Sequence, residues 1–278
     1  MDYRKGYTIK PAEVTSTGEV LFTNGTQQVL ANQVVCEAYG YNFNVESGTC
    51  SAYRYNSLLN NRITNKNNKI NGQNNNTERN SNNLVIIGSS NTTKGNNTNI
   101  LITGERNEIQ TGINNSSIIA GSLASIVNQG EVVLGGGGFN NAVGLSQVSF
   151  VQQSNKTTNN TETALLVQYL PLTYIQKVKN SVIGFESNVI GVNYGGGEGE
   201  VGQYIYLQLK GAVVFTNGLA STYTQTSTTI AAGGLTATAT MKDVTATSFG
   251  VNVTGAAETN IQWTASIKLW QNKLTTTF

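Results

Sequence analysis

The chain has 278 residues, of which 12% are charged, and its formal net charge is +2. This balance offers no basic patch or stripe of the kind that binds phosphate backbones, so we expect no nucleic-acid partner. The chain has no histidine and only two cysteines, which removes the usual general base and the commonest zinc ligand. We therefore expect no cofactor, no metal and no enzymatic activity.

The rest of the composition favours strands and turns. Threonine, asparagine, serine and glycine dominate, and the chain has two prolines and few helix-forming runs. No stretch approaches 18 apolar residues, so we expect no transmembrane helix and no membrane insertion. Residues 1–6 are charged and lack the apolar core of a signal peptide, so we expect synthesis in a cytosol.

Residues 1–55 are predicted to form a small β-rich N-terminal module. Val20–Phe22 and Val29–Leu30 flank the dipeptide Asn24-Gly25, which is a hairpin signal. Three aromatic residues then alternate along the chain, and we expect them in the core of this module: Tyr39, Tyr41 and Phe43. The position of this module before a repetitive segment suggests an attachment role.

The two cysteines flank a predicted hairpin with strands at 37–43 and 48–55. Cross-strand positions can bring Cys36 and Cys50 within bonding distance. In a protein made in a cytosol, two reduced and packed thiols are the first expectation. A disulfide is the alternative, which an extracellular particle would favour.

The middle of the chain repeats a short apolar segment that ends in glycine. The closing glycines are spaced by 16, 16, 17 and 14 residues: Gly72, Gly88, Gly104, Gly121 and Gly135. A second, more polar series ends in Gly95, Gly112 and Gly130. Two strands per coil at a nearly fixed period predict a solenoid over residues 56–150.

The first series is apolar on both faces, since runs such as Leu84–Ile87 and Ile100–Ile102 do not alternate with polar residues. One face can line the inside of the coil, and the other must meet another surface, most simply the same row of a sister chain. We therefore expect a homo-oligomer. The predicted core and interface residues are Leu84, Val85, Ile86, Ile87, Ile100, Leu101, Ile102, Ile118, Ile119, Val132, Val133 and Leu134.

The glycines of both series are predicted coil turns, because sharp turns need residues with positive φ, which glycine and then asparagine tolerate best. Residues 56–100 contain 17 asparagines in 45 positions. Asparagine side chains can cap turns and form ladders between stacked coils. The alternative, a disordered asparagine-rich tract, applies best to 56–80, where apolar residues are sparse.

The succession of 85–88, 89–95, 100–104 and 105–112 resembles the head repeats of trimeric YadA-like adhesins, which also occur in bacteriophage fibres. The resemblance covers about residues 60–140. It implies a trimeric left-handed parallel β-roll with the apolar row toward the threefold axis. The period here is longer than the usual coil of the family.

After the repeat we predict a linker at 151–163 and a separate domain at 164–278. The domain contains regularly spaced strand patterns typical of a sandwich or jelly roll. One strand has a clear apolar face that consists of Ile261, Trp263, Ala265, Ile267 and Leu269. Residues 249–257 and 260–265 resemble the closing strands of tip domains in phage fibres.

Two loops of this domain are candidate receptor sites. The segment 193–202 is rich in glycine and contains Glu198 and Glu200, and the segment 217–228 contains Tyr223. Exposed loops on a rigid scaffold often carry recognition, and tyrosine offers a large contact surface with one polar group. Paired carboxylates also occur in glycosidases, but on a flexible glycine loop we expect them to serve as solubilising charge.

Together these patterns predict an all-β protein with a trimeric β-roll shaft, an N-terminal module and a C-terminal sandwich tip. We expect a structural virion protein, a head or tail fibre or spike of a bacteriophage. It would bind a capsid or tail protein through its N-terminus and a host surface glycan or protein through its C-terminus. A bacterial trimeric adhesin and a polysaccharide-degrading tailspike are the alternatives.

Overall fold

The computed structural model describes residues 8–15, 18–45, 47–52 and 67–275. The protein is almost entirely β, as predicted, and residues 67–137 form a β-solenoid. The chain divides into two compact units, residues 1–63 and 64–278, which we describe separately. The module boundary predicted at 55 and 56, and the first part of the asparagine-rich tract, lie outside the described residues.

The first unit combines a three-stranded antiparallel sheet with one short helix and a hairpin. Its elements are β1 (Lys10–Val14), β2 (Val20–Thr23), β3 (Gln28–Val29), α1 (Gln33–Ala38), β4 (Asn42–Asn44) and β5 (Thr49–Ser51). The predicted turn between β2 and β3 is confirmed, because Phe22 pairs with Val29. The side chain of Asn24 accepts hydrogen bonds from the backbone amides of Thr26 and Gln27.

The core of the first unit is built around Phe22, whose ring lies edge-on to the rings of Tyr39 and Tyr41. This confirms the core role of these aromatic residues. The predicted strand at 37–43 is wrong in its first half, because Glu37 and Ala38 are the last two residues of a helix whose N-cap is Asn32. That helix carries Cys36, which forms a disulfide with Cys50 on β5, so the alternative to reduced thiols holds.

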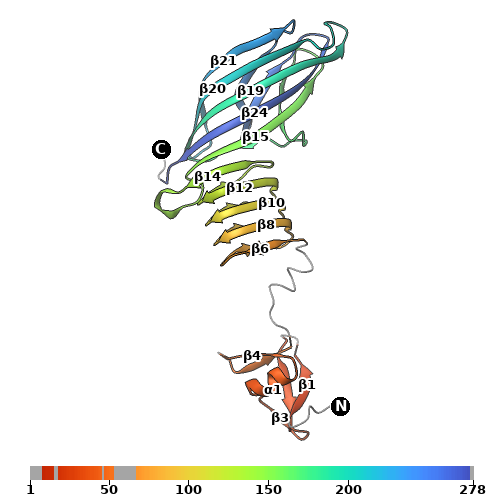
Figure 1. Ribbon diagram of the computed structural model, residues 1–278, viewed down its shortest axis with the longest axis vertical. Coiled ribbons are helices and arrows are strands. Elements are labelled where there is room, and N and C mark those ends of the chain that lie inside the picture. Colours follow the sequence, from red (N-terminus) through yellow and green to blue (C-terminus); the bar gives the residue numbers. More distant parts are fainter. Residues whose placement is uncertain (1–7, 16–17, 46, 53–66, 276–278) are drawn as a thin grey trace. The chain divides into compact units, whose positions relative to one another are not determined.

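The second unit begins with the roll, in which two rows of parallel strands stack coil on coil (Figure 1). The long row is β6 (Lys69–Asn71), β8 (Asn82–Ser89), β10 (Thr98–Glu105), β12 (Asn114–Ser122) and β14 (Val132–Gly137). The short, more polar row is β7 (Asn76–Thr77), β9 (Thr92–Thr93), β11 (Glu108–Ile109) and β13 (Ser125–Ile126). Both predicted series are therefore strands in register.

Asparagine ladders join successive coils. Inside the roll, the Nδ2 of Asn91 donates to Oδ1 of Asn75 at 3.0 Å, and the Nδ2 of Asn107 donates to Oδ1 of Asn91 at 3.0 Å. A second ladder on the surface links Asn67, Asn83, Asn99 and Asn115, all with φ between 53° and 58°. From residue 67 onward the asparagine-rich tract is thus ordered by stacking rather than disordered.

Three of the glycines that close the long strands, Gly72, Gly88 and Gly104, stack in a column with no room for a side chain. A Cβ on Gly88 would lie 1.8 Å from the carbonyl oxygen of Gly104, and one on Gly104 would lie 1.9 Å from that of Gly121. The predicted turns have positive φ except Gly121, where the structure corrects the prediction. In that 17-residue coil, the preceding Ala120 adopts the left-handed conformation, with φ 53°.

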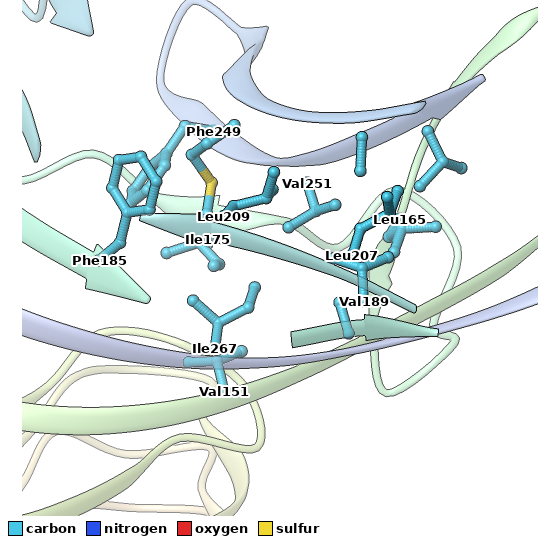
Figure 2. Packing of buried hydrophobic residues seen from close by; sticks show 14 of the residues in the cluster. Val151, Leu165, Ile175, Phe185, Val189, Leu207, Leu209, Phe249, Val251 and Ile267 are labelled. Carbon is cyan, nitrogen blue, oxygen red and sulfur yellow. The ribbon is translucent and has the colours of Figure 1, made fainter. Parts of the chain in front are cut away.

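Residues 146–273 form a two-layer sandwich. The large sheet consists of β21 (Ser221–Gly233), β20 (Tyr204–Phe215), β19 (Ser181–Gly196), β24 (Thr259–Lys273) and β15 (Ser146–Thr157). The small sheet consists of β16 (Glu162–Ala164), β23 (Ser248–Thr254), β18 (Ile175–Gln176) and β22 (Thr238–Thr245), while β17 (Leu166–Val167) pairs with β15. Figure 2 shows side chains of both layers, among them Ile267, Phe185 and Val251, pointing into one core. The apolar face predicted for β24 is confirmed.

The large sheet continues into the roll without a break, because β14 pairs with β15 in antiparallel orientation. The linker predicted at 151–163 is therefore wrong over most of its length. β15 runs to Thr157, and its register with β24 extends from Ser146 to Thr157. The polar residues 154–156 of the presumed linker are partly or fully exposed residues of this strand.

Candidate functional site

The long strands of the roll separate their apolar residues by face. Leu84, Ile86, Ile100, Ile102, Ile118 and Val133 are buried inside the coil. Val85, Ile87, Leu101, Ile119, Val132 and Leu134 point the other way, to the outside of the sheet. Of these six, the four largest are the most exposed: Ile87 at 49%, Leu101 at 37%, Ile119 at 43% and Leu134 at 46%.

These outward residues are aligned by the strand register. Val85 pairs with Leu101 and Ile119 pairs with Leu134, while Ser117 follows Leu101 and Thr103 follows Ile87 in the same two columns. Directly paired residues in a sheet point to the same face. The roll therefore presents a mainly apolar surface along one of its two strand rows, with the small polar residues Thr103 and Ser117 within it.

The same surface continues onto the sandwich. Leu134 pairs with Val148 on β15, which in turn pairs with Trp270 on β24, and Val132 pairs with Phe150. Trp270 is 39% exposed and stands beside a cavity of about 410 Å³ that Leu134 and Val148 also line. We call this surface the outer apolar face: Val85, Ile87, Leu101, Ile119, Val132, Leu134, Val148, Phe150 and Trp270.

A lysine of the sandwich also lies on this face. The Nζ of Lys268 is 4.6 Å from the ring centroid of Trp270 and 5.8 Å from that of Phe150. Such cation–π contacts leave the apolar stem of the lysine lying along the rings. The lysine therefore adds to the contact area and does not interrupt it.

The short strand row of the roll has a different outer surface. Ile109 and Ile126 point into the coil, whereas Glu108 and Lys94 face outward and form an ion pair at 3.5 Å. This polar row matches a solvated face, as its alternating pattern predicts.

The candidate receptor residues are placed differently from one another. Glu198 and Glu200 are exposed in the loop after β19, where the backbone amides of Gly197 and Glu198 donate to the carbonyl of Glu258. Neither carboxylate lines the cavity at Trp270. The described residues contain no cluster of three or more possible metal ligands, and none of their helices is long and apolar enough to cross a membrane.

The prediction for Tyr223 is corrected, because it lies in the strand β21 rather than in a loop. Its hydroxyl donates to Oδ1 of Asp243 at 2.6 Å, and the Nζ of the buried Lys177 lies 2.7 Å from Oδ2 of Asp243. Burial and the bond to Asp243 raise the pKa of Tyr223. Burial opposes the charge on Asp243, but hydrogen bonds from Lys177, Tyr223 and Ser221 outweigh it and lower the pKa of that carboxyl. Tyr223 is thus a structural residue of a charged cluster.

The sequence analysis missed a buried carboxylate. Glu131 stands in the last coil in the column that holds Leu84, Ile100 and then Ser116 in earlier coils, and it is 2% exposed. Its Oε2 accepts from the backbone amides of Val127 and Asn128 and from Nδ2 of Asn128 at 2.9 Å. Burial raises the pKa of Glu131 despite these bonds and one from Ser149. Asn128 also accepts from the amide of Gln176 in the sandwich, so this cluster joins the last coil to the next domain.

No protein-family model and no curated protein matches the chain. Among solved structures, the tailspike protein of Acinetobacter baumannii phage AM24 resembles it with a TM-score of 0.27 at 8% identity, over 72% of this chain and 54% of the tailspike. The tailspike protein of Acinetobacter phage vB_ApiP_P1 resembles it with a TM-score of 0.21 at 9% identity, over 73% of this chain and 52% of that one. The chain thus spans about half the length of both tailspike chains. Both TM-scores are below 0.5, so neither tailspike supports a conclusion about the function of this chain.

Proposed function

We propose that the chain is the subunit of a homotrimeric fibre or spike on a bacteriophage particle. In this proposal the chains assemble through the outer apolar face, the first unit docks to a capsid or tail protein, and the sandwich contacts the host surface. The observation that carries the proposal is the outer apolar face, which runs in register along the roll and onto Trp270.

Physical chemistry favours covering this face with copies of itself. Soluble monomers rarely expose an apolar surface of this extent. Burying the exposed half of a leucine or isoleucine contributes roughly 1 kcal/mol, and each of the four strands β8, β10, β12 and β14 carries such a residue. A rotation axis parallel to the stack brings identical coils to the same height, so each row meets its own symmetry copy and the assembly closes. The copy number of three comes from the resemblance to YadA-like head repeats.

The remaining parts support a binding role. The first unit has its own core and disulfide. In the sandwich, Glu198 and Glu200 are exposed on a glycine-rich loop, and we propose that they serve as surface charge rather than as a catalytic pair. A turnover assay on host-surface polysaccharide separates the two roles: release of oligosaccharides by the purified chain would mean a depolymerase.

The test of the proposal is genetic. Particles made from a phage genome with this gene disrupted should lack a set of projections in negative-stain micrographs and should adsorb poorly to host cells. Purified chain added to these particles should restore both. Particles with unchanged projections and unchanged adsorption would contradict the proposed function.

A further inference from the structure

A second surface on the sandwich has the features of a ligand site. A groove of about 330 Å³ lies on the outer face of the large sheet, between that face and the loop after β17. Tyr169 of the loop forms one side, while Lys156, Gln262 and Thr264 of the strands form the floor together with Ile190 and Val192. This volume is near the lower end of the range for small-ligand pockets.

The loop holds Tyr169 in a conformation that bulky residues rarely adopt. Gln168 and Tyr169 have φ of 51° and 57°, both in the left-handed region. Gln168 is anchored to the roll, because its Oε1 accepts from Nδ2 of Asn115 at 3.2 Å at the end of the surface asparagine ladder. The backbone amide of Gln168 donates to the carbonyl of Gln152 on β15. The roll and β15 thus both hold the loop that presents the Tyr169 ring, which is 54% exposed. Backbone strain of this kind concentrates at functional sites.

The polar groups of the groove are available to a ligand. Within the described part of the chain, the side chains of Gln262 and Thr264 have no hydrogen-bond partner, and no carboxylate pairs with Lys156. The Nζ of Lys156 is held 5.1 Å from the ring centroid of Tyr194, and it is the one charged residue of the lining. Amide and hydroxyl groups pair with hydroxyls, a lysine pairs with a carboxylate, and a tyrosine ring covers an apolar surface.

We propose that this groove binds an acidic saccharide unit of a surface polysaccharide, with its carboxylate on Lys156 and its ring against Tyr169. Gln262 and Thr264 bond the sugar hydroxyls in this arrangement. The inference rests on the proposed contact of the sandwich with the host surface. The groove is separate from the outer apolar face, because Gln262 is eight residues from Trp270 along β24, a distance of about 27 Å.

The test uses the purified intact chain on an array that carries uronic acid and sialic acid oligosaccharides beside their neutral parents. Acidic members should bind, and titration calorimetry then compares variants on the strongest of them. Lys156→Gln should weaken binding at least tenfold without affecting a neutral parent, and Tyr169→Ala should also weaken it at least tenfold. Tyr169→Phe should stay within about threefold, because the ring remains.

Lys210→Gln is the matched control, since Lys210 is an exposed lysine on β20, outside the groove, paired with Glu186. It should leave binding unchanged. Absence of binding to every acidic oligosaccharide at millimolar concentration, or equal binding by Lys156→Gln, Tyr169→Ala and the intact chain, would overturn the proposal.

Adsorption of the intact chain to host cells distinguishes a failure of the groove proposal from a failure of the proposed function. If the chain adsorbs to cells but ignores acidic oligosaccharides, the groove proposal fails and the host contact stands. If adsorption survives periodate oxidation of the cells and is lost after protease treatment, the partner is a protein and the groove proposal fails. If the oligosaccharides bind through Lys156 but the chain does not adsorb, the proposed function fails alone.

Discussion

At the residue scale, two glycines of the roll differ in the space that surrounds them. Gly104 cannot accept a Cβ, because that atom would lie 1.9 Å from the carbonyl oxygen of Gly121 in the next coil. Gly112 also has positive φ, but a Cβ there would meet nothing within 4 Å. Substitutions at the two positions therefore distinguish the cost of backbone strain alone from the cost of strain together with blocked stacking of the coils.

Gly112→Ala should cost about 1 kcal/mol of strain, which lowers the melting temperature by roughly 2–4 °C. Gly104→Ala should lower it at least twice as much, because the coils must move apart as well. Thermal unfolding followed by circular dichroism measures both. Equal shifts for the two variants would show that the coils are not stacked as closely as described.

The buried Glu131 predicts a pH dependence. Its folded pKa is raised above 4.5 by burial, so the fold favours the protonated form, and stability falls as the pH rises from the unfolded pKa through the folded pKa. Each unit of difference costs about 1.4 kcal/mol above that range. Glu131→Gln keeps a side-chain acceptor for the amides of Val127 and Asn128 and removes the charge.

We therefore expect Glu131→Gln to melt at a higher temperature than the intact chain at pH 8, and to show a flatter profile between pH 4.5 and 8. Melting curves across this interval test the expectation. A parallel pair of profiles would mean that Glu131 is not desolvated in the folded protein.

Some of these residues could be predicted from the sequence and others could not. The glycine turns follow from the repeat itself, apart from the shift to Ala120 in the 17-residue coil. Glu131 also had a signal, because the column of Leu84 and Ile100 turns polar at Ser116 and continues in Glu131. The groove had none: Tyr169 meets Gln262 across more than 90 positions of sequence, and only the folded sheet and the loop bring them together.

At the element scale, β10 tests whether the outward row is an interface. Leu101 on this strand is exposed in the single chain, whereas its neighbour Ile102 is buried inside the coil. An aspartate at 101 therefore leaves the interior of the coil intact. A buried, unpaired carboxylate in an interface costs several kcal/mol, and symmetry repeats that cost in every copy.

Leu101→Asp should shift the protein to a smaller species in gel filtration at micromolar concentration, with an unchanged circular dichroism spectrum. Thr240→Asp on β22 is the matched control, since it places the same charge on an exposed strand position of the small sheet, and it should elute with the intact chain. Co-elution of both variants with the intact chain would show that the outward residues of the long strands do not form an interface.

Strands with an apolar period were predicted well, and strands without one were missed. β24 buries every second residue, as its sequence indicates. β21 is rich in threonine and mostly exposed. It lacks an apolar period, and the sequence therefore predicts a loop at 217–228, which overlaps the first part of this strand. β15 ends in polar residues that read as a linker, and its pairing with β24 over twelve positions depends on a partner more than a hundred residues away.

At the scale of the whole molecule, the two units have different proposed tasks: the first unit docks to the particle, and the second unit assembles and contacts the host. Deletion of residues 1–63 removes a unit with its own core and leaves the roll and sandwich complete. The shortened chain should assemble and adsorb to cells but should no longer co-sediment with particles that lack the protein. Retained docking together with lost adsorption would reverse the proposed polarity.

The continuity of the long sheet has a consequence for assembly. β14 of the roll pairs with β15 of the sandwich, and β15 pairs with β24. A surface of the roll that packs against a sister chain therefore leads directly to Trp270 on β24. The shaft and the base of the tip should therefore assemble as one cooperative body rather than as two domains joined by a linker.

The native mass of the intact chain tests the central claim most directly. Light scattering coupled to gel filtration at micromolar concentration should give three times the chain mass of 29.6 kDa, because the outer apolar face is covered by sister chains. A stable, soluble species with the mass of one chain would contradict the account, since it would leave this face in water.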